Sequence, residues 1–388
     1  MKAAWYRRNG AAKDVLEIGE LETPVPGPGE VRVKLSTSGV NPSDVKSRAS
    51  RPVSDPLIIP HSDGAGVIDA VGAGVNPARK GERVWVWNAQ WQRPFGTACE
   101  YVCLHEQQAV HLPDHIDEAA AACLGIPALT AIQAIRLAPP LKGKTVLVTG
   151  AASGVGHYAV QLAKLEGARV LGTVGNPTRA SHALSGGCDE VIFYKTEPVA
   201  QRVKDLTGGA GADVIIDLDF ASTSSLLPQG VLKHHGTCVV YGSNNPAELP
   251  VHFRTLLWGS LNLRFFLVYD LSQEDRQATV ERLQTLLRER KLQHTVGARY
   301  GLSQIAQAHE AVEQGQVVGH VVIDPFTGES LSRDDLAERL IPWLPGAKLG
   351  RPQAISDDAL AFHLQPAEPR QIIARMLRNL HEIYRRQD

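Results

Sequence analysis

The sequence predicts an α/β protein in which a β-rich region precedes a doubly wound domain. Before about residue 120, short strand-like runs alternate with Gly and Pro, and apolar Val31, Val33 and Leu35 alternate with polar residues. From about residue 124, nearly continuous apolar runs alternate with amphipathic segments of helical length. Strands of that kind are buried on both faces, which indicates a parallel sheet with helices above and below it.

The expected elements follow in chain order. The turn-forming segment PVPGPGE precedes the first clear strand, and ERVWVW at residues 82–87 supplies another. A charged amphipathic helix is expected at about 273–290, and residues 296–324 predict a strand, a helix and a strand. Because this last segment is too short to be a domain, we expect it to complete the N-terminal domain. The strands of the parallel sheet are expected at residues 145–150, 168–175, 189–194, 212–218, 236–242 and 261–268.

The residues after Phe326 predict further helices. Ser332 and Asp335 form a capping-box pattern, and the apolar residues from Ile372 to Tyr384 lie on one helical stripe. We therefore expect residues 327–388 to form a helical C-terminal extension that packs on the main body or on a second copy of the chain. A docking segment for another protein and a disordered tail are the alternatives.

Composition disfavours several classes of protein. The chain has 388 residues, and 40 Lys and Arg against 41 Asp and Glu give a net charge of -1, which offers no attraction for nucleic acid or an anionic membrane. No run approaches the ~20 apolar residues of a membrane span, and MKAAWYRRNG lacks the apolar core of a signal peptide. Five widely spaced Cys indicate reduced thiols. We expect a cytoplasmic protein with no nucleic-acid or membrane partner.

A glycine-containing loop joins the strand at 145–150 to the next helix. Small residues let the backbone approach a pyrophosphate, whose charge is met by free N–H groups at the positive end of the helix. The next strand begins ~20 residues later, as in a βαβ unit. We therefore predict a dinucleotide site, with a simple packing turn as the alternative. The loop residues are Gly150, Ala151, Ala152, Ser153, Gly154, Val155 and Gly156.

The end of the second strand of this unit predicts the choice of dinucleotide. An Asp or Glu there would bind the adenosine ribose, but residues 173–179 contain no acid. Arg179 can instead meet a 2′-phosphate, with Asn176 and Thr178 as neutral donors. We predict NADPH rather than NADH; the alternative is that Arg179 is a solvated cation in the first helical turn.

A wider set of segments occurs in a recognisable order and spacing: PVPGPGEVRVKL, GVNPSDVKSRA, IPHSDGAGVIDAVGAGV, GERVW, GIPALTA, VTGAASGVG, LAKLEGARVLGTVG and VVGHVVI. With this set, residues 1 to about 326 resemble the zinc-independent quinone oxidoreductase (zeta-crystallin-like) branch of the medium-chain dehydrogenase/reductase superfamily. The resemblance implies a GroES-like substrate domain at 1–123 and 291–326 and a Rossmann domain at 124–290, with the cofactor and substrate in the cleft between them. It also implies a homodimer joined at the edge strand 261–268, whose apolar character invites pairing.

The resemblance implies roles for individual residues. Asn41 and Asp44 would line the catalytic end of the cleft. Other residues would contact the cofactor: Thr130 near the nicotinamide carboxamide, Tyr194 near the adenosine, and Gly242, Ser243 and Phe266 around the nicotinamide ribose and ring.

The resemblance also implies that the chain lacks a zinc site. Zinc-dependent relatives have a Cys where this chain has Asn41 and a His-Glu pair where it has Ser62 and Asp63. These side chains do not supply the three or four ligands of a tetrahedral zinc site. Cys99, Cys103 and His105 alternate onto one side of a predicted strand, but a half-buried strand face explains them better than a metal does. We expect no metal.

Three residues are predicted to border the substrate. Lys46 lies where the family often has Tyr, and Lys46 with Arg48 would make a cationic mouth suited to a substrate with an electron-rich or anionic tail; solvent exposure of both is the alternative. His61, one position before a lost zinc ligand, is interpreted as lining the cleft or lying just behind its wall.

A carbonyl oxygen without zinc lacks the Lewis acid that stabilises a developing alkoxide. The predicted reaction is therefore hydride transfer from NADPH to an electrophile that delocalises its own charge, such as a quinone or an α,β-unsaturated carbonyl. A specific enoyl or alkenal reductase and a non-catalytic NADPH-binding protein, as in lens crystallins, are the alternatives.

Overall fold

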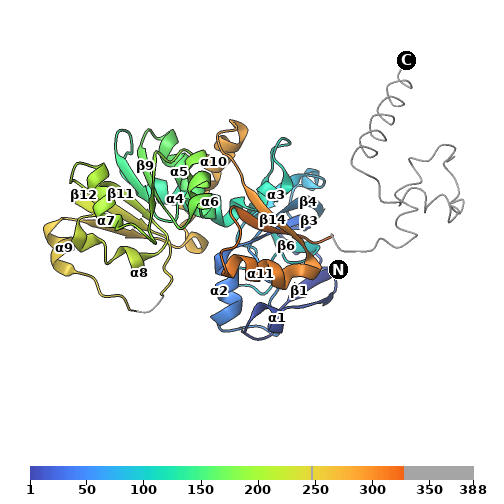
Figure 1. The fold of residues 1–388 in the computed structure, drawn as a ribbon. Coiled ribbons are helices and arrows are strands. Elements are labelled where there is room, and N and C mark those ends of the chain that lie inside the picture. The colour runs from blue at the N-terminus through green and yellow to red at the C-terminus, as the bar shows by residue number, and fades with distance from the viewer. Residues whose placement is uncertain (246–247, 327–388) are drawn as a thin grey trace, which may run out of the picture. The chain divides into compact units, whose positions relative to one another are not determined.

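The computed structural model describes residues 1–245 and 248–326, and Met1–Gly328 belong to one compact unit. The C-terminal extension expected at residues 327–388 lies outside the described residues. The described part contains two lobes, each built around a large sheet (Figure 1). This confirms the predicted α/β class.

One lobe holds a sheet of six parallel strands among the described residues, in the order β10-β9-β8-β11-β12-β13. This is the strand order of a Rossmann fold, in which ligands bind where the order reverses, here between β8 and β11. All six strands overlap the ranges expected from the apolar runs. They are β8 (Thr145–Val148), β9 (Arg169–Val174), β10 (Glu190–Phe193), β11 (Ala212–Asp217), β12 (Leu232–Val240) and β13 (Asn262–Phe265).

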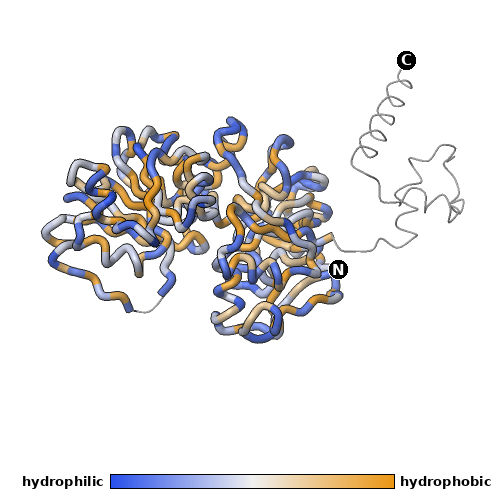
Figure 2. The backbone as a smooth tube through the Cα atoms, viewed as in Figure 1, coloured by the Kyte–Doolittle hydropathy of each residue, from blue (hydrophilic) through white to orange (hydrophobic). Residues whose placement is uncertain are grey.

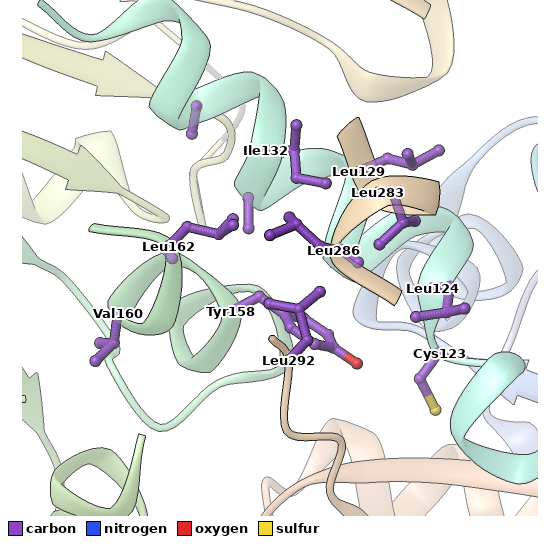
Figure 3. Packing of buried hydrophobic residues seen from close by; sticks show 14 of the residues in the cluster. Cys123, Leu124, Leu129, Ile132, Tyr158, Val160, Leu162, Leu283, Leu286 and Leu292 are labelled. Carbon is purple, nitrogen blue, oxygen red and sulfur yellow. The ribbon is translucent and has the colours of Figure 1, made fainter. Parts of the chain in front are cut away.

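Successive residues of these strands pack into two different cores. Val146 and Val148 of β8 join one buried cluster, whereas Leu147 between them joins another on the opposite face. The first face is covered by α4, α5 and α10, and Figure 3 shows Ile132, Tyr158 and Leu286 from these helices in one packed cluster. The helices of this lobe are α4 (Leu129–Leu137), α5 (Gly154–Leu165), α6 (Pro177–Ser185), α7 (Val199–Leu206), α8 (Phe220–Thr223), α9 (Phe253–Trp258) and α10 (Gln273–Arg288), with short turns η3 (Leu124–Ala128), η4 (Leu227–Gln229) and η5 (Val268–Asp270).

The other lobe is β-rich, as predicted. Its larger sheet has the order β14-β15-β3-β4-β5-β7, with β6 also paired to β3, and a two-stranded sheet β1-β2 lies beside it. The strands are β1 (Lys2–Trp5), β2 (Glu17–Glu20), β3 (Glu30–Val40), β4 (Asp63–Val71), β5 (Arg83–Val86), β6 (Tyr101–His105), β7 (Ala109–His111), β14 (Val296–Gly301) and β15 (His320–Asp324). The helices are α1 (Ala12–Val15), α2 (Pro42–Ser50), α3 (Glu118–Ala121) and α11 (Ile305–Glu313), with short turns η1 (Pro77–Arg79), η2 (Glu106–Gln108) and η6 (Leu302–Gln304).

The chain returns to the β-rich lobe after α10. Strand β15 pairs antiparallel with β3, with Val322 opposite Gly39, so the segment predicted as strand, helix and strand joins the N-terminal sheet. We propose domain boundaries at 1–123 with 291–326 and at 124–290. Figure 2 shows apolar segments along the strands and hydrophilic segments in many loops. None of the helices described here is long and apolar enough to cross a membrane.

Candidate cofactor and active site

The turn between β8 and α5 is closely packed at its glycines. Gly150 has a φ of 62°, a left-handed conformation that favours glycine. A Cβ atom on Gly156 would lie 2.2 Å from the Gly150 carbonyl oxygen. The Ser153 hydroxyl accepts a hydrogen bond from the Gly156 N–H at 3.0 Å and caps α5. Because first-turn N–H groups of a helix lack intrahelical partners, this turn offers an anion site where the strand order reverses.

The remaining loop residues lie in the same turn: Ala151 and Ala152 are buried, Gly154 and Val155 begin α5, and Val155 packs against the core. Two further side chains, missed by the sequence analysis, lie beside them. A Cβ atom on Gly154 would lie 2.6 Å from Cε1 of His320, at the start of β15. The hydroxyl of Tyr241 is buried beside Ser153 and makes no hydrogen bond of good geometry to the described residues. The close-packed glycines and this buried hydroxyl both suit a bound dinucleotide.

The residues predicted to bind the adenosine end come together after β9. Asn176 caps α6 by accepting a hydrogen bond from the Arg179 N–H at 2.9 Å, and Thr178 is exposed beside it. A Cβ atom on Gly175 would lie 3.0 Å from the hydroxyl of Tyr194, which is 53% exposed. Tyr194, Asn176 and Arg179 therefore border the same strand end.

The guanidinium of Arg179 has a partner that the sequence analysis did not foresee. Its Nη2 donates to the carbonyl oxygens of Gly315 and Val317, at 2.7 and 3.1 Å. Arg179 is thus not simply a solvated cation, because it ties α6 to the loop before β15. Nε and Nη1 make no hydrogen bond to the residues that the structure describes, so part of the group is available to an anion.

Asn41 lies between β3 and α2, where its side chain holds Asp63 at the start of β4. Asn41 Nδ2 donates to Asp63 Oδ2 at 2.8 Å, and the Ile126 N–H donates to the same oxygen at 3.0 Å. Asp63 is fully buried, and its Oδ1 has no hydrogen-bond partner among the described residues. A Cβ atom on Gly125 would lie 2.2 Å from that oxygen. Burial raises the pKa of Asp63 well above its usual range.

Asp44 fixes the start of α2. Its Oδ2 accepts a hydrogen bond from the Asn41 N–H at 2.7 Å, which forms a capping box around the helix start. Burial raises the pKa of Asp44 to about 7, against the lowering effect of its hydrogen bonds with Asn41. Asn41 and Asp44 therefore share one buried polar group with Asp63.

Tyr269, in the turn η5 of the Rossmann-type lobe, reaches this group. Its hydroxyl lies 2.7 Å from Ser43 Oγ and beside Ser62. Its ring stacks on Trp91 at 4.9 Å, and its carbonyl oxygen accepts a hydrogen bond from Asn88 Nδ2 at 2.8 Å. No local motif marks Tyr269, so the sequence alone does not predict its place in the site.

Of the predicted nicotinamide-side residues, Thr130 lies in α4, whereas the others follow strands. Thr130 is buried, and its hydroxyl donates to the Ile126 carbonyl oxygen at 2.6 Å across η3. Gly242 and Ser243 follow β12, and a Cβ atom on Gly242 would lie 2.7 Å from the Leu218 carbonyl oxygen. Phe266 follows β13, and its N–H donates to the Val240 carbonyl oxygen at 3.2 Å.

Lys46 and Arg48 do not form one cationic mouth. Lys46 is exposed, and its Nζ lies 3.4 Å from the Ser243 carbonyl oxygen of the other lobe. Arg48 is fully buried and donates to the Gly10 carbonyl oxygen and to Glu313. Arg48 therefore neither borders the substrate, as predicted, nor lies in solvent, as the alternative would have it. Residues two apart on a helix point to opposite sides, which explains the separation.

His61 is fully buried within the β-rich lobe, behind the site and not at its surface. Its Nδ1 lies 2.8 Å from Ser38 Oγ and its Nε2 lies 2.9 Å from His309 Nε2. Thr97 links Ser38, at 2.7 Å, to the carbonyl oxygen of Asp63, at 2.5 Å. His61 is therefore a packed support for the strand that begins at Asp63, and the cleft-lining interpretation does not fit.

The donor set does not suit a zinc ion. Ser62 and Asp63 are buried, and Asn41 is already bonded to Asp63. Among the described residues, no group of three or more His, Cys, Asp or Glu side chains is placed to hold a metal ion. On β6, Cys103 is buried whereas His105 is exposed, so they do not converge on one ligand.

Family models match both lobes. The model for the alcohol dehydrogenase GroES-like domain matches residues 27–114, and the model for zinc-binding dehydrogenases matches residues 154–285. A third model, for the transglutaminase-like superfamily, matches residues 302–378. The described part of that match, residues 302–326, contains α11 and β15 of the β-rich lobe. The matched range contains no cysteine, so it cannot supply a thiolate nucleophile.

Individual proteins extend the likeness over most of the chain. A quinone oxidoreductase from Pseudomonas aeruginosa is 33% identical over 328 residues, which cover 80% of this chain and 96% of that protein. A 2-haloacrylate reductase from a Burkholderia species is 28% identical over 345 residues, covering 84% and 99%. The crystal structure of Escherichia coli quinone oxidoreductase complexed with NADPH matches with a TM-score of 0.75 and 26% identity, covering 84% of this chain and 100% of that one.

Proposed function

Because the chain belongs to the quinone oxidoreductase branch of the medium-chain dehydrogenase/reductase superfamily, we propose that it reduces a quinone or an α,β-unsaturated carbonyl with NADPH and without a metal. The proposal rests on contacts that bring residues of the two lobes together. The Asn41–Asp63 pair adjoins Tyr269, and Lys46 meets Ser243 at the end of β12. The polar group that replaces a zinc site therefore lies beside the nicotinamide end of the dinucleotide site.

NADPH fits the residues of the Rossmann-type lobe. The first turn of α5 would hold the pyrophosphate, and the buried Tyr241 hydroxyl beside Ser153 supplies a donor that makes no hydrogen bond of good geometry to the described residues. Arg179 would hold the 2′-phosphate through its available Nε and Nη1, with Asn176 and Thr178 beside it. The NADPH complex of the Escherichia coli relative supports the same cofactor.

The bound nicotinamide supplies a hydride, and the residues of this chain orient the acceptor. The Asn41 amide is held on Asp63, so it presents a fixed polar wall. The described residues form no metal ligand set that could polarise a carbonyl oxygen, which favours acceptors that delocalise the incoming charge themselves. Exposed Lys46 would favour an acceptor with an electron-rich or anionic substituent.

A homodimer joined through β13 is part of the proposal. This strand is the edge of the six-stranded sheet, and Phe265 on it is 59% exposed. Nearby apolar side chains are also exposed: Phe253 and Trp258 at 69% each, Leu257 at 61% and Leu267 at 49%. An apolar edge of this kind is suited to pairing with another strand.

The likeness to a 2-haloacrylate reductase favours activated alkenes as a second class of acceptor beside quinones. The test is NADPH oxidation, followed at 340 nm, with a panel of quinones and a panel of enones. Turnover of either panel, with NADPH preferred over NADH, supports the proposal. NADPH binding without turnover of either panel contradicts it and indicates a non-catalytic NADPH-binding protein.

A further inference from the structure

The hydroxyl of Tyr269 occupies the junction of the two lobes. Tyr269 belongs to η5 of the Rossmann-type lobe, and its partner Ser43 lies at the second position of α2 in the β-rich lobe, 2.7 Å away. Ser62 lies on its other side. Because Asn41 precedes Ser43 by two residues and Asp63 follows Ser62, the hydroxyl adjoins the polar group that would face the hydride acceptor.

The surroundings of Tyr269 hold this hydroxyl in place. Trp91 stacks on the ring with an interplanar angle of 25°, and Asn88 holds the backbone carbonyl. Burial and the neighbouring Asp44 raise the pKa of Tyr269, so the hydroxyl keeps its proton across the physiological range. A hydroxyl that is held in place and stays protonated can donate a proton to an enolate carbon, which is more basic than a phenolate.

Reduction of an activated alkene needs such an acid, whereas reduction of a quinone does not. A hydride added to the β-carbon of an enone leaves an enolate, whose α-carbon must gain a proton. A reduced quinone gains protons on its oxygen atoms, which exchange with water without assistance. One protein therefore treats the two substrate classes differently if it carries a positioned proton donor.

We propose that the Tyr269 hydroxyl protonates the α-carbon of an α,β-unsaturated carbonyl after hydride reaches its β-carbon. The two electrons come from NADPH as hydride, the C=C π bond is lost, and a C–H bond forms at each carbon. The resulting phenolate takes a proton from Ser43, which is half-buried and regains one from water. The first turn of α2 stabilises the transient negative charge. This inference rests on the proposed reductase function.

The test compares Tyr269→Phe with the wild-type protein on one quinone and one α-substituted enone. We expect enone turnover to fall by ~10²–10⁴-fold while quinone turnover stays within a few fold. We also expect the wild-type protein to give one enantiomer of the reduced enone and the variant to lose that selectivity, because water would then protonate either face. A merely structural role would change neither the ratio of the two activities nor the stereochemistry.

Tyr158→Phe is the matched control for the loss of a buried hydroxyl, because the Tyr158 hydroxyl lies 2.7 Å from His294 Nδ1 and makes no contact with Ser43. It should leave the enone-to-quinone ratio unchanged. Ser43→Ala retains the tyrosine and should lower enone turnover alone, which keeps the test valid if Tyr269→Phe folds poorly. Equal losses on both substrates, or a wild-type protein that reduces quinones only, overturn the role of Tyr269. A wild-type protein that reduces neither class contradicts the proposed function itself.

Discussion

The side-chain amide of Asn41 donates a hydrogen bond to the buried carboxyl of Asp63 at 2.8 Å. Two segments that are remote in sequence, the end of β3 and the start of β4, are joined at this bond. Asp63 accepts a second hydrogen bond from Ile126 of η3, so the same carboxyl ties the β-rich lobe to the segment that enters the Rossmann-type lobe. The site is therefore a structural junction as well as a polar wall.

Replacing Asn41 with Ala should destabilise the protein. Asp63 would lose one of two donors while remaining buried, which costs ~1–3 kcal/mol. Thermal unfolding should show a lower Tm, and NADPH oxidation with the preferred acceptor should slow. Asn9→Ala removes a half-exposed amide that donates to backbone carbonyls outside the site, and it should leave turnover unchanged. An Asn41→Ala protein as stable and active as wild type would contradict the assigned role.

Arg179→Ala should change the cofactor preference. The loss of a charge-assisted contact with the 2′-phosphate, worth ~1.5–3 kcal/mol, should weaken NADPH binding by roughly ten- to a hundred-fold. NADH has no 2′-phosphate, so its affinity should change little. Titration calorimetry with both cofactors measures the difference. An equal loss for both would show that Arg179 acts only through its hydrogen bonds to Gly315 and Val317.

The buried histidines beside the phosphate loop should make stability depend on pH. Burial and the neighbouring His182, stacked at 4.0 Å, lower the pKa of His157 to about 4. In the unfolded chain this ring takes up a proton near pH 6.5. Because the unfolded state binds more protons between about pH 6.5 and 4, acidification through this range lowers the free energy of unfolding. Asp44 has the opposite effect, because its pKa is raised to about 7 in the folded protein. Between its unfolded value and about 7 the folded state binds more protons, so this group raises the free energy of unfolding on acidification.

A comparison of variants isolates the histidine contribution. His157→Leu should lose stability less steeply than wild type between pH 6.5 and 4, as measured by urea unfolding at several pH values. The exposed His234 provides a matched His234→Leu control, which should follow the wild-type curve. Parallel curves for His157→Leu and wild type would exclude His157 as a source of acid lability.

The proposed dimer predicts a single-residue disruption. Phe265→Glu places a charge on the β13 edge and should convert a dimer to a monomer with little loss of monomer stability, because the ring is already exposed. Phe95→Glu, at a similarly exposed ring in the β-rich lobe, should leave assembly unchanged. Analytical ultracentrifugation separates the two states. A wild-type protein that is monomeric at micromolar concentration would rule out this interface.

Local patterns predicted the fold well and the site less completely. Nearly continuous apolar runs marked all six strands of the Rossmann-type sheet, because successive residues such as Val146 and Leu147 both enter a core. The spacing of Gly150, Gly154 and Gly156 located the phosphate loop, since Gly150 has a positive φ and a Cβ atom on Gly156 would meet the Gly150 carbonyl oxygen.

Long-range contacts account for what the sequence did not reveal. Tyr269 meets Ser43 across 226 positions, and His61 meets His309 across 248, so no local period or spacing indicates either pair. Arg48 was assigned to the mouth with Lys46 because the two are close in sequence. Helical geometry places them on different sides of α2, and Glu313 pairs with the buried guanidinium of Arg48.

Turnover by metal-stripped protein distinguishes metal-free hydride transfer from zinc-dependent catalysis. After exhaustive chelation, with zinc measured by elemental analysis, anaerobic NADPH oxidation should proceed with a quinone or an enone at the untreated rate, consuming one NADPH per acceptor molecule reduced. Well under one zinc per chain should be found before treatment. Stoichiometric zinc together with turnover that chelation abolishes, and that added zinc restores, would contradict the account.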